Sequence, residues 1–410
     1  MGAGIFTIIG SAAGLVGNAL WVSLLFAGAA AFLTALSYAE LIAMMPKARA
    51  EYQFLKAGFP EAPLVSFLAG FLIALNAAAT SATVSLAFAG YLKVFLEVPV
   101  PLTALALLTL CTALNIAGLR QATWVGIGVI VIEVSGLLLL IAMGLKKGGP
   151  GSTITLPSFG DGAGIFAAAA LVFFVYIGFE NVANLSEEAK DARRDVPRAL
   201  LWSVSLTSLL YLLVVWAVLS VVEPRQLAQS DSPLTTAGLA IAPWLARTLA
   251  ITAIFATASK PLILLLSISR LLFAVARDGD MPRALAKTMT RRNSPWVAAL
   301  ALYAAACLLL PLGEVRIITS ISALRILAVF IGVHAAVILL RFREPGRERP
   351  FRVSWRIGRM PLLPSIGILI SLALMNRFEP VVYAVTAVAV AFSMLVYWGT
   401  RGRLPRNVTR

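Results

Sequence analysis

The sequence predicts an all-α polytopic membrane protein, and three observations carry that prediction. Of its 410 residues, 60% are hydrophobic, and the mean hydropathy is +0.90. The apolar residues lie in long continuous runs, and about 20 such residues suffice for a helix that crosses a bilayer. Charged residues make up only 13% of the chain, about half of the ~25% found in soluble domains. These features exclude a soluble globular protein. The length of the runs also excludes a membrane β-barrel, whose strands alternate over ~10 residues.

Twelve apolar segments are expected to form helices. The first, at residues 2–15, is short, and eleven longer runs follow it. They cover residues 18–45, 62–95, 100–119, 122–145, 163–190, 198–222, 243–278, 295–313, 316–341, 361–376 and 379–400. We number these segments as helices 1 to 12.

The basic residues predict the orientation in the membrane. Of the 34 Lys and Arg, 25 lie after even-numbered helices or in the C-terminal tail, and seven lie in the opposite set of connections. Such an asymmetry places the richer side in the cytoplasm. We therefore expect a multi-pass protein of the plasma membrane with a cytoplasmic C-terminus. The dense run from Arg341 to Arg359 is either a plain topology determinant or a contact for anionic lipid. The net charge of +15 is thus explained without a nucleic-acid partner.

The composition offers little for catalysis or metal binding. His334 is the only histidine, and Cys111 and Cys307 both sit in apolar runs. A metal site needs a cluster of such ligands, and an enzyme needs a clustered nucleophile or acid–base pair. We expect no enzyme activity, no metal and no cofactor.

Two glycine-containing breaks lie five helices apart, at Gly2-Ala3-Gly4-Ile5-Phe6 and at Tyr176-Ile177-Gly178-Phe179-Glu180-Asn181. Transporters built from inverted repeats use one such break per repeat to form a binding site. A half-helix that begins at Gly4 directs amide groups toward a carboxylate. One that ends near Ile177 offers carbonyl groups to an ammonium. The alternative for the second glycine is close packing of helices. Glu180 is costly in mid-span and is therefore a functional candidate.

Several motifs resemble those of amino acid permeases of the amino acid–polyamine–organocation superfamily. They are GAGIFTIIGSAAG (2–14), SYAELIAMMP (37–46) with EYQFLK (51–56), FFVYIGFENVANLSEEAKDARRDVPRAL (173–200), SRLLFAVARDGDMPRAL (269–285) with SPW (294–296), and REPGRERPFRV (343–353). The resemblance implies a LeuT-type fold with two five-helix inverted repeats, at residues 1–145 and 163–341, followed by residues 342–410. It also implies secondary transport of amino acids, usually coupled to protons. A second GAGIF, at 162–166, is taken as coincidence.

The resemblance also assigns site residues. Gly2, Ala3, Gly4 and Ile5 would hold the substrate carboxylate, and carbonyl groups at Phe174, Val175 and Ile177, beside Gly178, would hold the amine. Phe174 and Phe179 would flank or gate the substrate side chain, and Glu180 would join the occlusion or coupling network.

The chain departs from the family pattern in two places. Met1 directly precedes the GAGIF motif, so helix 1 is expected to lack its first half, either through a start codon further upstream or through a natural truncation. Lys260 occupies helix 8 where the family has small or hydroxyl residues. We expect it to pair with Glu133 of helix 5 in place of a coupling cation. Separate polar or water contacts for the two charges are the alternative.

The leading hypothesis is a proton-coupled transporter of neutral amino acids with broad specificity, in contact with membrane lipid and of unknown oligomeric state. The alternative is a non-transporting amino-acid sensor or interaction protein, or an inactive truncated permease. Among other polar residues, Glu40 is expected to pair with an arginine, His334 to be satisfied in the interior and Arg325 to snorkel outward. A stripe of Asn76, Thr80 and Thr83 is either interhelical glue or cavity wall.

Overall fold

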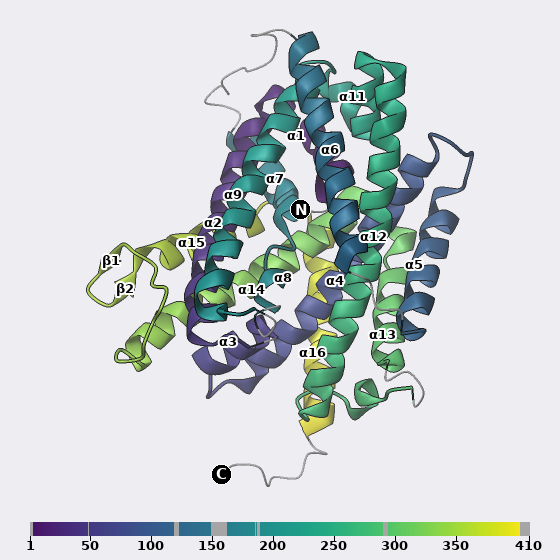
Figure 1. Cartoon of the computed structure of the whole chain (residues 1–410). Coiled ribbons are helices and arrows are strands. Elements are labelled where there is room, and N and C mark those ends of the chain that lie inside the picture. The colour runs from purple at the N-terminus through teal and green to yellow at the C-terminus, as the bar shows by residue number, and fades with distance from the viewer. Residues whose placement is uncertain are drawn as a thin grey trace.

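The computed structural model describes residues 3–47, 49–118, 123–148, 162–184, 186, 189–289 and 294–401, which form a bundle of helices (Figure 1). The first half contains α1 (Gly4–Val16), the 3-10 helix η1 (Gly17–Ala19), α2 (Leu20–Met44), α3 (Ala50–Gly58), α4 (Pro63–Leu92), α5 (Val100–Ile116) and α6 (Thr123–Gly148). Proline stands in the first turn of several helices, among them α4, α11 and α12, where its missing N–H costs nothing.

The second half begins with a helix that is interrupted in mid-span. Its elements are α7 (Gly162–Val172), η2 (Phe173–Tyr176), α8 (Asn181–Asn184), α9 (Ala192–Leu219), α10 (Pro224–Ala228), α11 (Pro233–Ile241), α12 (Pro243–Arg277), η4 (Arg283–Ala286), α13 (Trp296–Cys307), η5 (Leu310–Leu312), α14 (Val315–Arg343), β1 (Arg356–Ile357), β2 (Met360–Pro361), α15 (Leu362–Met375) and α16 (Pro380–Arg401). The two short strands pair antiparallel and form a small hairpin before α15.

The apolar segments coincide with these helices. Eight stretches are long and apolar enough to cross a membrane, and the first of them contains both α1 and α2. Three shorter apolar helices, α5, α13 and α15, complete the set of twelve segments that the sequence predicts. Short elements between the spans, such as α3, α10 and α11, were not expected.

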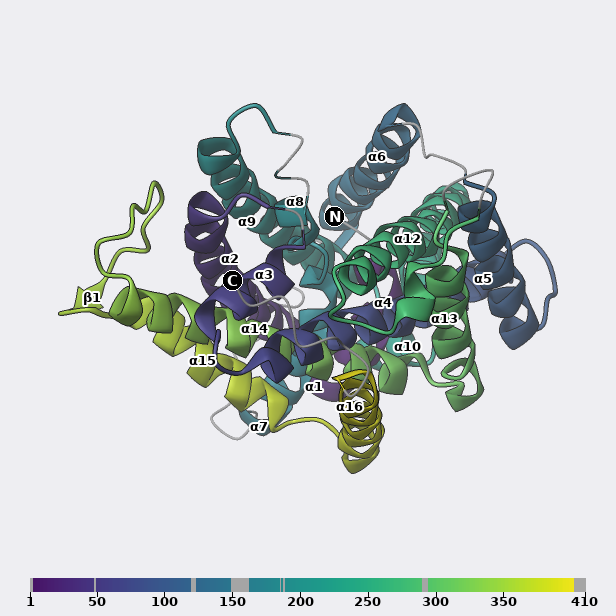
Figure 2. The same ribbon diagram turned by 90° about the horizontal axis from the view of Figure 1, so that it is seen from below.

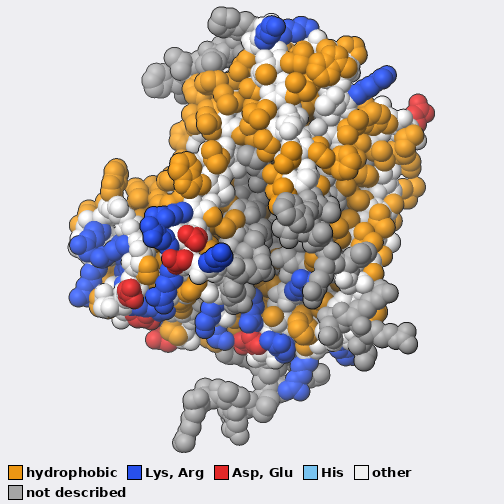
Figure 3. Space-filling model, viewed as in Figure 1, with side chains coloured by type: hydrophobic (Ala, Val, Ile, Leu, Met, Phe, Trp, Pro, Cys, Tyr) orange, Lys and Arg blue, Asp and Glu red, His pale blue; other side chains and the backbone are white. Residues whose placement is uncertain are grey.

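The surface fits a bilayer. Large apolar side chains such as Trp202, Leu308 and Leu395 are mostly exposed, and soluble proteins do not expose apolar area on this scale. Figure 3 shows hydrophobic side chains over the upper part of the visible face, with most of the visible Lys and Arg gathered toward its lower end. The helices therefore present an apolar belt above a basic end.

The helices pair in a regular way. α1 packs against α7, α2 against α9, α4 against α12 and α5 against α13. In each pair, the second helix stands five places after the first in the order of the predicted spans. Figure 2 shows α2 beside α9 and α5 beside α13, at different sides of the bundle. The two halves of the chain are thus interleaved and do not form separate domains side by side.

A buried cluster of charges joins α2 to the basic end. Glu40 accepts hydrogen bonds from Arg341 Nε (2.9 Å), from Arg341 Nη2 and from the backbone N–H of Val353 (2.9 Å). Arg349 adds an ion pair, with Nε 3.3 Å from Oε1 of Glu40. All three charged side chains are almost completely buried. The predicted pairing of Glu40 with an arginine is confirmed, and the cluster fixes α2 to α14 and to the connection before the hairpin.

Two other polar residues of α14 are also buried. The His334 ring nitrogens lie 2.8 Å from Ser37 Oγ and 3.2 Å from Thr34 Oγ1, so the prediction of a satisfied interior histidine is confirmed. Arg325 was expected to reach outward, and this was wrong. Its side chain turns into the bundle and donates to the carbonyl of Leu75 on α4 (3.3 Å), because that face of α14 packs against α4 and away from lipid.

Candidate functional site

The start of α1 lies against the interruption between α7 and α8. α1 packs on both α7 and η2, and a Cβ built on Gly4 would lie only 2.8 Å from the Cα of Val175. Ala3 and Phe174 belong to one small apolar cluster, and Ile5 is buried. The two predicted breaks therefore meet. Gly2 lies outside the described residues.

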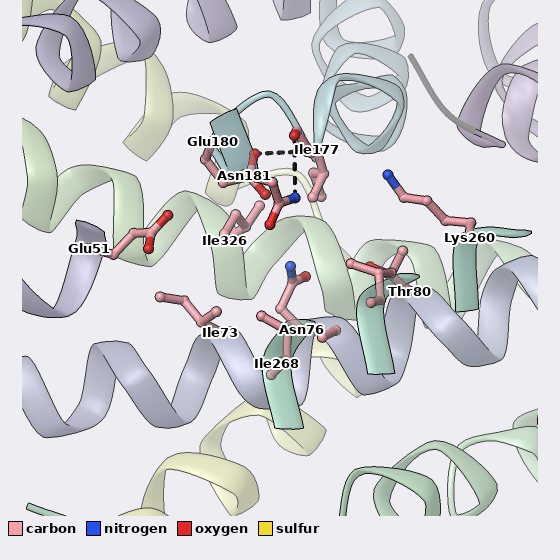
Figure 4. A pocket seen from close by; sticks show the side chains of 13 residues that line it. Glu51, Ile73, Asn76, Thr80, Ile177, Glu180, Asn181, Lys260, Ile268 and Ile326 are labelled. Atoms are coloured by element: carbon pink, nitrogen blue, oxygen red, sulfur yellow. Dashed lines mark hydrogen bonds between the residues drawn. The ribbon is translucent and has the colours of Figure 1, made fainter. Parts of the chain in front are cut away.

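The interruption has defined geometry. η2 ends at Tyr176, Ile177 is extended, and Gly178 has φ +124°, a conformation that favours glycine. The Gly178 N–H donates to Oε2 of Glu180 (2.7 Å), and its carbonyl accepts from Asn181 Nδ2 (3.2 Å), as drawn in Figure 4. Glu180 and Asn181 thus satisfy backbone groups that a continuous helix would have paired.

Lys260 of α12 stands beside the same glycine. A Cβ on Gly178 would lie 2.9 Å from Lys260 Nζ, so the glycine permits the ammonium to approach the main chain. Glu133 of α6 is buried, and its Oε1 has no hydrogen-bond partner among the described residues. Among the described residues, no carboxylate oxygen of Glu133 lies within 4.0 Å of Lys260 Nζ. Both Glu180 and Glu133 nevertheless act electrostatically on Lys260. The two predicted partners are not in direct contact in this conformation.

A small cavity of about 20 Å³ opens between the break, α3, α4, α12 and α14. It is lined by Glu51, Ile73, Asn76, Ala77, Thr80, Ile177, Gly178, Glu180, Asn181, Lys260, Leu264, Ile268 and Ile326. That volume admits about one water molecule and is too small for an amino acid. The conformation is therefore closed around the break.

Two residues of the predicted stripe on α4, Asn76 and Thr80, link α4 to α14, as the interpretation as interhelical contacts expects. Asn76 and Thr80 line the cavity. They also bond Ser322 of α14, which lies 2.5 Å from Asn76 Oδ1 and 2.9 Å from Thr80 Oγ1. Thr83 is buried beyond them.

The aromatic candidates lie elsewhere. Phe179 does not line this cavity, and its ring contacts the rings of Tyr38 and Phe330. Phe174 packs in the apolar cluster with Ala3, and its carbonyl accepts the Ile177 N–H (3.1 Å).

Sequence reasoning missed the apolar lining residues Ile73, Ala77, Leu264, Ile268 and Ile326. It also missed one charged lining residue, Glu51. It lies in a polar connection, where a charged side chain is ordinarily taken as solvated, and in the structure α3 turns it inward. A larger cavity of about 420 Å³ lies among α1, α4 and the connections poor in basic residues, with Thr7, Gly90, Asp231 and Arg316 among its lining residues. It occupies the end of the bundle away from the basic loops.

Comparison with known proteins identifies the family. A model of the family described as amino acid permease matches residues 1–400. The chain belongs to this family of amino acid permeases. It is therefore a multi-pass membrane transporter and not an enzyme.

Individual relatives of this permease differ in what they carry. It is 28% identical to a branched-chain amino acid permease of Bacillus subtilis, over 97% of this chain and 89% of that protein. It is also 28% identical to a methylthioribose transporter of the same organism, with the same coverage. A vacuolar cationic amino acid transporter 4 of Arabidopsis thaliana is 30% identical over 84% of this permease, but only 61% of that protein is covered.

Proposed function

We propose that this permease is a proton-coupled secondary transporter of neutral amino acids with broad specificity. Access would alternate between the two sides of the membrane around the start of α1 and the break at 177–180. The observation that carries the proposal is the direct apposition of Gly4 on the main chain of Val175. It brings the start of α1 next to the end of η2 inside an apolar bundle, and transporters built from inverted repeats bind the charged groups of a substrate at such helix ends.

The LeuT-type repeat belongs to this proposal. Residues 1–145 and 163–341 would be inverted repeats, and residues 342–410 would add two further helices. Four of the five early helices, α1, α2, α4 and α5, pack against the helix five places later, and this pairing supports the proposal, since elements related by a two-fold axis meet near that axis.

The substrate groups follow from the helix ends. The amide groups from Gly2 to Ile5 would bind the carboxylate, because the positive end of α1 lies there. Carbonyl groups of Phe174, Val175 and Ile177 would bind the ammonium, Gly178 would let the chain turn, and Phe174 and Phe179 would close over the side chain.

The character of the lining favours an aliphatic substrate side chain. Ile73, Leu264, Ile268 and Ile326 form an apolar wall in the cavity, and the nearby Lys260 would repel a cationic side chain. The branched-chain permease among the relatives agrees with that preference.

Coupling is assigned to the buried charges. Lys260 would take the place of a cation beside the break, held by Glu180 and, in another conformation, by Glu133. A proton on one of these two carboxylates would change how strongly that carboxylate attracts the Lys260 ammonium. The basic end would face the cytoplasm together with the C-terminus, against the anionic lipid of the plasma membrane.

Uptake into proteoliposomes tests the proposal. With an inward proton gradient, labelled leucine is expected to accumulate above its equilibrium level, and a protonophore should abolish the accumulation. Replacing Lys260 by methionine keeps an unbranched side chain of similar size and removes its charge. We expect accumulation to fall at least roughly tenfold, as loss of an interaction of about 1.4 kcal/mol predicts.

Lys93→Met is the matched control, because Lys93 is exposed and pairs with Asp231 at the surface. It should retain accumulation. Leucine uptake that reaches equilibrium at the same level with and without the gradient would contradict proton coupling. Equal accumulation by the Lys260 and Lys93 variants would contradict the role of Lys260.

A further inference from the structure

Helix α3 carries a carboxylate into the interior of the permease. The helix has nine residues and follows α2 at the basic end. Glu51, in its first turn, is only 1% exposed. Its Oε1 accepts a hydrogen bond from the Tyr38 hydroxyl (3.1 Å), while Oε2 has no partner within the described part of the chain. The side chain extends toward the cavity and Glu180 (Figure 4).

Few charges face Glu51. Tyr38 reaches it from α2, Glu180 acts on it from the break, and Lys260 lies across the cavity on α12. The cavity residues from α4 and α14 are uncharged: Ile73, Asn76, Ala77, Thr80 and Ile326.

Two other polar residues of α3 contact the connection after α12, and one of them, Tyr52, is itself buried. Tyr52 donates to Asp280, and Lys56 pairs with the same carboxylate.

This setting favours the neutral carboxyl. Burial raises the pKa of Glu51 from 4.5 to about 7, a backbone hydrogen bond opposes the change, and the Glu180 carboxylate adds to it. Because the pKa in the closed form lies above the ordinary value, protonation stabilises that form fully below about pH 4.5. The stabilisation is lost as the pH rises through about 7. Exposure of Glu51 to water would return its pKa toward 4.5 and release the proton.

The charged contacts of α3 lie on its outer face, while its inner face is buried by apolar side chains such as Phe54 and Leu55. Its outer face is held by Arg49 with Asp278 and by Lys56 with Asp280 (3.1 Å), and these side chains are partly exposed. Each surface ion pair of this kind contributes only about 0–1 kcal/mol to the stability of the folded protein. The inner face packs against α4 and α14, where Leu55 sits on Gly332. Movement of α3 away from the bundle would therefore uncover the carboxyl without breaking a buried ion pair.

We propose that Glu51 is a proton-binding site in a gate formed by α3. With the gate closed, Oε2 of Glu51 holds a proton that entered through the cavity beside Glu180. When α3 moves outward, water reaches the carboxyl, and the proton leaves to the solvent at the basic end. The inference rests on the proposed proton-coupled transport and assigns a residue to its release step.

Glu51→Gln tests the inference, because the amide resembles the protonated carboxyl and cannot release a proton. The variant should bind leucine within about threefold of the unmodified permease. It should also exchange labelled for unlabelled leucine, yet fail to accumulate leucine under a proton gradient. Glu51→Asp should restore accumulation with a shifted pH midpoint. Glu61→Gln is the control, since Glu61 is exposed, with its Oε1 3.9 Å from Arg343 Nη2. It should behave as the unmodified protein.

The outcomes separate the two proposals. If the unmodified permease accumulates nothing under a proton gradient, the proposed function itself fails. If it does accumulate leucine and Glu51→Gln accumulates as much, Glu51 is not the proton site. Loss of leucine binding and exchange in Glu51→Gln, without rescue by Glu51→Asp, would assign Glu51 a purely structural role and also overturn the inference.

Discussion

Alanine at Gly4 is expected to lower amino acid uptake at least roughly tenfold. The added Cβ would lie 2.8 Å from the Cα and 3.3 Å from the Cβ of Val175. The closest of these atoms belongs to the main chain of η2, so no side-chain rotation relieves the contact. Overpacking of this kind costs about 1–3 kcal/mol, and 1.4 kcal/mol corresponds to tenfold. The start of α1 must move away from the break, and the proposed carboxylate and ammonium sites separate.

The second GAGIF motif supplies a matched control. Gly164 occupies the position in that motif that Gly4 occupies in the first, but a Cβ there would meet only the Leu15 carbonyl, at an ordinary 3.5 Å. Initial rates of labelled leucine uptake should therefore fall for Gly4→Ala, vanish for the larger Gly4→Leu and stay near the unmodified rate for Gly164→Ala. Similar rates for the Gly4 and Gly164 alanine variants would show that the apposition of the two breaks is not needed for transport.

Removal of the Glu40 carboxylate is expected to cause the largest loss of stability. Glu40→Ala would leave Arg341 and Arg349 buried without an anion, and the Val353 N–H would lose its acceptor. Breaking a buried ion pair by deleting one partner costs about 3–5 kcal/mol, because the remaining charge stays desolvated. That amount is a large part of the ~5–15 kcal/mol by which folded proteins are stable.

Denaturant unfolding in detergent micelles, followed by tryptophan fluorescence, measures this effect. Glu344→Ala is the control, since it breaks a partly exposed pair with Arg347 one turn away, and such pairs contribute about 0–1 kcal/mol. We expect a free energy of unfolding lower by several kcal/mol for the first variant and almost unchanged for the second. Equal losses for both would mean that the buried cluster contributes no more than a surface pair.

The sequence predicts the membrane spans well for a physical reason. A backbone that crosses hydrocarbon must satisfy its polar groups within the segment, so long apolar runs become helices. The positions of α4, α12 and α14 agree with expectation within a few residues. The break at Gly178 is also recognisable, because a carboxylate two residues after a mid-span glycine is costly in a membrane and marks a functional position.

The direction in which individual side chains point is harder to predict from the sequence than the positions of the spans. Arg325 stands ten residues after the start of α14, and the face that it occupies packs on α4. Glu51 has the sequence context of a solvated charge, and only the docking of α3 turns it inward. In both cases the outcome depends on contacts between segments that are far apart in the chain, and local hydropathy does not record them.

The interleaved pairing of helices has a consequence for biosynthesis. Glu40 and its partner Arg341 are 301 residues apart in the chain. A ribosome that adds about 5–20 residues each second needs on the order of 15–60 s to cover that distance. During this interval the carboxylate of α2, and the hydroxyl groups that later meet His334, have no native partner in the bilayer. The nascent first half must therefore remain near the insertion machinery, or rest shallowly at the interface, until the second half emerges.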